Sequence, residues 1–123
     1  MIKVVIGGQL NKQAIEKQIR EMGGDKIEVI VKSDLDAVMA IKNNQADYYV
    51  GACETGSGGA LAMALALLGR DNCVSLSSPS TMKSTNEIEA EVYSGKIAFG
   101  FTAPSSKNVL NDLIPALLNK NLG

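Results

Sequence analysis

Short apolar runs alternate with helix-like segments along the whole chain, and this alternation limits the possible fold more than any other feature. The runs are rich in Val, Ile, Tyr or Phe, as buried strands are: Lys3–Ile6, Ile27–Lys32, Tyr48–Ala52, Cys73–Leu76 and Ile97–Phe101. Segments with helical spacing of apolar residues separate them. Parallel strands need crossover connections, so this order predicts a parallel sheet covered on both faces by helices.

We therefore expect one α/β domain over residues 1–123, a three-layer sandwich around a parallel five-stranded sheet. The flavodoxin-like, Rossmann-like strand order 2-1-3-4-5 is the first choice, because five strands and their helices fit this length. The chain is 46% hydrophobic, which supplies one ordinary core and leaves no room for a second.

The charge balance and the apolar runs exclude two classes of partner. Twelve basic and thirteen acidic residues give a net charge of -1, which is not the basic footprint of a nucleic-acid-binding protein. The segment Ala60–Leu68 is apolar throughout but about half as long as a membrane span. We expect a cytoplasmic protein without membrane insertion.

The sequence contains two cysteines and no histidine. Without histidine there is no Ser-His relay and no imidazole ligand for a metal. Asp34 and Asp36 could hold Mg²⁺, but two carboxylates at a helix start are more typical of caps. We expect no metal site and no cofactor.

The glycine-dense run Gly51–Gly59 follows the third strand and leads directly into a helix. Backbone N–H groups at a helix start favour an anion or a developing oxyanion. The run is no nucleotide P-loop, because Ala60-Leu61 stands where Lys-Ser or Lys-Thr is required. It lacks the arginine with which a cysteine phosphatase clamps phosphate. It therefore predicts a loop for another kind of small ligand.

A parallel sheet binds ligands where the strand order reverses, here between the ends of the first and third strands. Gly7-Gly8-Gln9 follows the first strand, and small hydroxyl residues follow the fourth. Such a rim suits a compact polar metabolite better than a dinucleotide. The predicted ligand-binding residues are Gly7, Gly8, Gln9, Thr55, Gly56, Ser57, Gly58, Gly59, Ser78 and Ser80.

Cys53 and Glu54 are the candidate catalytic residues. The helix dipole should lower the pKa of the Cys53 thiol and the adjacent Glu54 should raise it, so we expect the two effects to cancel. Cys53 could equally be a small buried apolar residue. Glu54 could be a base, a partner for a substrate amine, or a favourable acidic residue in the first helical turn.

The segment Asp47–Gly58 resembles the Cys-Gly-Thr-Gly-x-Gly loop of the type B ribose-phosphate isomerases and their galactose-phosphate relatives. The resemblance implies that Cys53 moves a proton between adjacent sugar carbons while Thr55, Gly56 and Gly58 steady the enediolate. Glu54 replaces a usual glycine, and Gly7-Gly8-Gln9 replaces the family's Asp-His pair. The likeness supports the fold and an oxyanion-binding pocket more than the reaction.

Over its full length the chain resembles the YhfU-like bacterial proteins, in Asp47–Cys53, Thr55-Gly56 and Gly95–Gly100. That resemblance implies a small cytosolic protein encoded beside a membrane transporter and enzymes of small-molecule metabolism.

Three functions fit these residues. The first is binding of a compact anionic or polyhydroxy metabolite, linked to a transport or catabolic system. The second is an aldose-ketose isomerase with Cys53 as base, and the third is a phosphocarrier subunit with Cys53 as acceptor. The segment Ala60–Leu68 has no polar face, so it is either covered by the rest of the chain or packs against a second copy in a homo-oligomer.

Overall fold

The computed structural model describes residues 1–56 and 58–122. One all-parallel sheet is formed by β1 (Ile2–Gly8), β2 (Ile27–Val31), β3 (Tyr48–Cys53), β4 (Cys73–Ser75) and β5 (Ala98–Thr102). The helices are α1 (Lys12–Gly23), α2 (Asp34–Lys42), α3 (Gly58–Leu68), α4 (Thr85–Tyr93) and α5 (Ser106–Leu122). Single 3₁₀ turns precede β2, β4 and α5, at Gly24–Lys26, Arg70–Asn72 and Ala103–Ser105.

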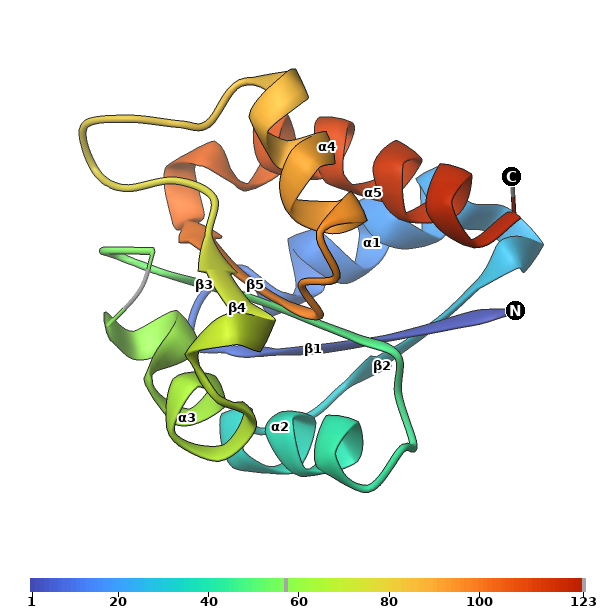
Figure 1. Ribbon diagram of the computed structural model, residues 1–123, viewed down its shortest axis with the longest axis horizontal. Coiled ribbons are helices and arrows are strands. Elements are labelled where there is room, and N and C mark those ends of the chain that lie inside the picture. Colours follow the sequence, from blue (N-terminus) through green and yellow to red (C-terminus); the bar gives the residue numbers. More distant parts are fainter. Residues whose placement is uncertain (57, 123) are drawn as a thin grey trace.

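The predicted three-layer α/β sandwich is confirmed. In Figure 1, α1, α4 and α5 cover one face of the sheet, and α2 and α3 cover the other. Strand β3 shows why the layers separate, because its side chains alternate between the faces. Tyr48 and Val50 pack into the core under α1 and α5, while Tyr49 packs into the core under α2 and α3.

The order of the last two strands differs from the prediction. The sheet runs β2-β1-β3-β5-β4, so β5 lies beside β3 and β4 forms the edge. Helix α4 packs against α5 on the α1 face, and a right-handed crossover through that face carries the chain back from β4 toward β3. The edge strand is short and partly exposed, whereas all five residues of β5 are buried.

This order places β3 between two reversals of the chain. Helix α3, which follows β3, lies on the opposite face of the sheet from α1 and α5, which follow β1 and β5. The chain therefore leaves β1 and β5 toward one face of the sheet, whereas it leaves β3 toward the other face. Ligands of α/β sheets bind at such reversals, outside the carboxyl ends of the strands. In the parts of the chain that the structure describes, no helix is long and apolar enough to cross a membrane.

Candidate functional site

The loop after β3 lies between the segment that follows β1 and the end of β4. The amides of Gln9 and Leu10 both donate to Ala52 O, at 3.0 and 3.1 Å, so the chain leaving β1 crosses the end of β3. On the other side, the hydroxyl of Ser75 donates to Gly56 O at 3.1 Å. Cys53, Glu54, Thr55 and Gly56 are thereby fixed between their neighbours. Ser57 lies outside the described residues.

Cys53 is the last residue of β3, and its side chain is surrounded by hydrogen-bond donors. Its Sγ accepts the Gly56 amide at 3.1 Å and lies 3.5 Å from Thr55 Oγ1. Burial raises the pKa of the thiol, but hydrogen bonds from the Thr55 hydroxyl and the amides of Thr55, Gly56 and Ala60 outweigh burial. The pKa of Cys53 is lowered, which favours the thiolate.

The structure overturns the expected cancellation between the helix dipole and Glu54. Glu54 is exposed, and its charge is not among the causes that shift the pKa of Cys53. Water screens an exposed carboxylate, whereas the amide donors contact the sulfur directly. Local hydrogen bonds therefore decide the ionisation of Cys53.

The rim glycines pack closely against other parts of the protein. A Cβ on Gly56, whose φ is 84°, would lie 2.1 Å from Ser77 O, so only glycine fits there. Gly7 leaves room for the ring of Tyr49, and the Gly8 amide donates to Asp34 Oδ1 at 3.0 Å. These contacts give each glycine a structural role, and ligand binding by Gly7, Gly8 and Gly56 stays a prediction.

A hollow of about 230 Å³ opens beside the Cys53 side chain. The amide of Gln9 covers Gly59, where a Cβ would lie 2.5 Å from Gln9 Oε1. Gly58 begins α3 directly before it. The hollow brings together three of the predicted ligand-binding residues, the two catalytic candidates and Leu10. Its lining consists of Gln9, Leu10, Cys53, Glu54, Thr55 and Gly59. Leu10 was not predicted, because an apolar side chain after a strand carries no chemical signature.

A second hollow of about 470 Å³ contains the predicted Ser78 and Ser80. Hydroxyl groups and small apolar side chains dominate its lining, which also includes Asn108 of α5. Glu54 lines both hollows, so they are neighbours at this residue. The sequence did not predict that Asn108 lines this hollow, because the position of α5 beside the serine-rich loop depends on the strand order.

Hydroxyl groups fix the wall of the second hollow. Ser105 Oγ lies 2.7 Å from Ser77 Oγ and 2.6 Å from Thr102 Oγ1. Across the hollow, Ser78 and Thr81 bond each other through backbone and side chain, at 2.8 and 2.9 Å. These bonds hold the serine-rich loop in a defined shape.

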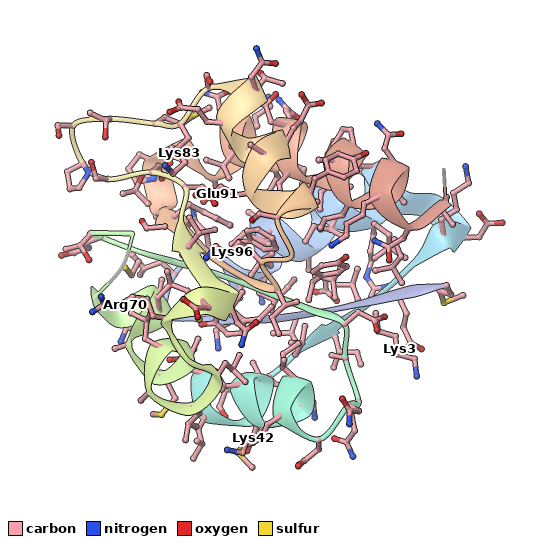
Figure 2. The ribbon with its side chains drawn as sticks, viewed as in Figure 1. Lys3, Lys42, Arg70, Lys83, Glu91 and Lys96 are labelled. Carbon is pink, nitrogen blue, oxygen red and sulfur yellow. The ribbon has the colours of Figure 1, made fainter. Side chains whose placement is uncertain are left out.

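Charged side chains are sparse at the two hollows. Glu54 is the one charged side chain among the described residues that line them. Lys83, which follows the serine-rich loop, is directed at Glu91 of α4, with 3.9 Å between Nζ and Oε2 (Figure 2). The hollows are therefore bordered by one carboxylate and by a thiol whose pKa is lowered.

Asp34 and Asp36 have structural partners at the start of α2. Asp34 Oδ1 accepts hydrogen bonds from the Gly8 amide and the Tyr49 hydroxyl, and the backbone amide of Asp36 donates to the Ser33 hydroxyl that caps the helix.

A larger hollow of about 530 Å³ lies between α1 and α5, away from Cys53. Two of its amide side chains, Gln18 and Asn111, bond each other at 3.1 Å, so they are not directed at a ligand.

The family model described as "Protein of unknown function DUF2620" matches residues 2–117. The chain belongs to this family. Proteins named "Uncharacterized protein YhfU" from Escherichia coli strain K12 and Shigella flexneri are 33% identical to it over 119 residues, covering 97% of each chain. The predicted relationship to the YhfU-like proteins is confirmed.

A solved structure shares the fold of this DUF2620 member. A ribose 5-phosphate isomerase RpiB from Thermotoga maritima superposes with a TM-score of 0.65 and 16% sequence identity. The match covers 95% of this chain and 86% of the isomerase chain. At this identity the likeness shows the fold alone.

Helix α3 has an apolar outer face in this family member. Ala60, Leu61 and Ala64 are buried against the sheet, while Met63 and Leu65 are 36% and 38% exposed. The helix carries no polar side chain from Ala60 to Leu68. The sheet therefore covers only part of its apolar surface.

Proposed function

We propose that the protein binds a compact polyhydroxy metabolite at the end of β3 and that the Cys53 thiolate acts on it as a base. The observation that carries this proposal is the set of amide and hydroxyl donors on Cys53 Sγ, which lowers the pKa of the thiol beside an open hollow. A base works best when its pKa lies near the working pH. The shared fold with a sugar-phosphate isomerase adds weaker support.

The proposed step is proton transfer within a hydroxycarbonyl compound. Cys53 Sγ takes the proton from the carbon next to the carbonyl and returns it to the carbonyl carbon, while the hydroxyl proton moves between the two oxygens. The intermediate is an enediolate, whose oxygen carries the negative charge that develops in this step. The chain has no histidine to open a sugar ring, so the proposed substrate is an open-chain form.

The charge at the site favours an uncharged ligand over a phosphorylated one. Glu54 borders both hollows, and a thiolate at Cys53 adds a second negative charge. A phosphate in either hollow would be repelled by both groups. Hydroxyl groups of Ser80 and Thr81 and the amide of Asn108 offer hydrogen bonds to a polyhydroxy chain instead. The same repulsion argues against the phosphocarrier function.

Binding without chemistry is the second candidate. The larger, hydroxyl-lined hollow supports it, because that hollow offers a ligand several hydrogen-bonding groups independent of Cys53. The two candidates differ in what the Cys53→Ser variant should do. A ligand bound mainly through hydrogen bonds should still raise the melting temperature of that variant, by mass action.

The test screens open-chain aldoses, ketoses, polyols and their phosphates against the purified protein. Thermal shift measures binding, and NMR in D₂O measures exchange of the C–H proton next to the carbonyl. We expect stabilisation by unphosphorylated compounds and exchange that Cys53→Ser abolishes. Cys73→Ser is the matched control, since Cys73 lies at the start of β4, away from the site. Exchange that persists in Cys53→Ser would refute the base, and preferential binding of phosphates would refute the ligand class.

A further inference from the structure

Tyr49 is a fully buried phenol whose hydroxyl reaches the ends of three elements. It lies on the α2 and α3 face of β3, where its hydroxyl donates to Asp34 Oδ1 and lies 2.5 Å from Ala60 O. The Gly8 amide donates to the same carboxylate oxygen at 3.0 Å. One hydroxyl group therefore joins the end of β1, the start of α2 and the first turn of α3.

Two glycines paired across neighbouring strands make room for this phenol. Gly7 of β1 and Gly51 of β3 are partners in the sheet register. A Cβ on Gly7 would lie 2.5 Å from Tyr49 Cε2, and one on Gly51 would lie 2.7 Å from the Tyr49 hydroxyl oxygen. Gly7, a predicted ligand-binding residue, and Gly51, the first residue of the glycine-dense run, therefore also leave the space that Tyr49 occupies.

Ala60 connects the phenol to the thiol. Its carbonyl oxygen lies 2.5 Å from the Tyr49 hydroxyl, and its amide is among the backbone groups that lower the pKa of Cys53. We propose that Tyr49 is a positioning residue, which holds the first turn of α3 so that the Ala60 amide stays close to Cys53 Sγ. This inference rests on the proposed function only in that Cys53 is the working group.

Few titratable groups surround Cys53. Tyr49 on β3 is coupled electrostatically to Cys53, Asp34 on α2 bonds the Tyr49 hydroxyl, and Glu54 follows Cys53 in the loop, while α3 has no ionisable side chain. Burial, followed by the hydrogen bond to Asp34, raises the pKa of Tyr49 far above its usual value, so the phenol stays neutral. Tyr49 therefore remains a donor across the whole range in which a thiol titrates.

The test is the pH titration of Cys53 by ultraviolet absorbance of the thiolate, in a Cys73→Ser background. We expect Tyr49→Phe to raise the pKa of Cys53 by about 0.5 to 1, the effect of losing one hydrogen bond. Tyr48→Phe is the matched control, because Tyr48 lies on the opposite face and its hydroxyl accepts from Asn121 at 2.9 Å. A Tyr49→Phe titration equal to wild type, or an equal rise in Tyr48→Phe, would overturn the proposal.

A double variant separates positioning from simple charge. Tyr49→Phe removes one of the two donors to Asp34 Oδ1, and the less compensated negative charge could itself raise the pKa of Cys53. If positioning is the cause, the pKa stays raised in Tyr49→Phe/Asp34→Asn relative to Asp34→Asn. A rise that disappears in this pair would refute positioning.

Gly51→Ala gives an independent test if Phe at position 49 prevents folding. Its Cβ displaces the phenol hydroxyl while Tyr49 itself is retained. We expect the same upward change in the pKa of Cys53, and an unchanged pKa in the folded variant contradicts the proposal. Neither titration needs a substrate, so failure here is distinguishable from failure of the proposed proton-transfer reaction.

Discussion

The backbone amide of Gly56 donates a hydrogen bond to Cys53 Sγ at 3.1 Å. This bond closes a turn of four residues, 53–56, in which the chain itself supplies the acceptor for a donor near the helix start. The sequence suggested that such donors face a ligand. At Gly56 the structure instead directs the donor to a thiol of the protein itself.

The two cysteines should differ in reactivity toward iodoacetamide. The pKa of Cys53 is lowered, whereas burial raises the pKa of Cys73 despite the charge of Lys96. The thiolate is the nucleophile, so Cys53 should react faster, because its larger thiolate fraction outweighs the lower nucleophilicity of a thiolate with a lower pKa. Peptide mapping by mass spectrometry after short exposure of the native protein measures the two rates. Faster modification of Cys73 would contradict the hydrogen-bond arrangement at Cys53.

Gly56→Ala should destabilise the protein strongly. Its positive φ disfavours alanine, and the added Cβ would lie 2.1 Å from Ser77 O. We expect a loss of about 3 kcal/mol or more in the free energy of unfolding, measured by urea denaturation. Gly95→Ala is the matched control, because φ is 105° there and nothing lies within 4 Å of the added Cβ. Its cost should be the conformational term alone, about 1–2 kcal/mol. Equal losses in both variants would show that the contact with Ser77 is not rigid.

Stability should depend on pH through Cys53. Its folded-state pKa lies below the unfolded value of about 8.5, so the unfolded state binds more protons between the two values. In a Cys73→Ser background, the contribution of Cys53 is fully present above the unfolded pKa. It is lost as the pH falls through the folded pKa. The difference in unfolding free energy between Cys53 and Cys53→Ser proteins should therefore grow with pH across this window, and a difference that shrinks would be inconsistent with a stabilised thiolate.

Helix α3 should mediate self-association. Met63 and Leu65 are exposed on a helix without polar residues, so a second copy of this chain is the partner we predict for that face. Met63→Lys/Leu65→Lys should shift the protein from an oligomer to a monomer in sedimentation velocity experiments. Tyr93→Lys is the control, since Tyr93 is 56% exposed on α4. A wild-type protein that is monomeric at all concentrations would exclude this interface.

The fold followed from the sequence because strands and helices alternate with clear periodicity. The order of the last two strands did not follow, because helix propensity does not say which face of the sheet α4 covers. The three-residue β4 and the fully buried β5 do carry information on this point, since short, partly exposed strands are typical of sheet edges.

The candidate site was predictable in position but not in its internal contacts. Gln9, Cys53 and Thr55 were identified from glycine spacing and the topology rule, and they line one hollow. Tyr49 was not identified, because a tyrosine inside an apolar strand is indistinguishable in sequence from a core residue. Its link to Asp34 is a long-range contact that depends on the packing of α2 against β1 and β3.

The position of β3 between two diverging connections has a consequence for engineering. The chain segments on either side of its loop leave toward the opposite face of the sheet, so replacing the loop does not require the sheet to be rewired. A loop grafted between β3 and α3 would need to keep a glycine at position 56, because this residue packs against Ser77 O. The rest of the segment is the natural place to vary when this scaffold is redesigned.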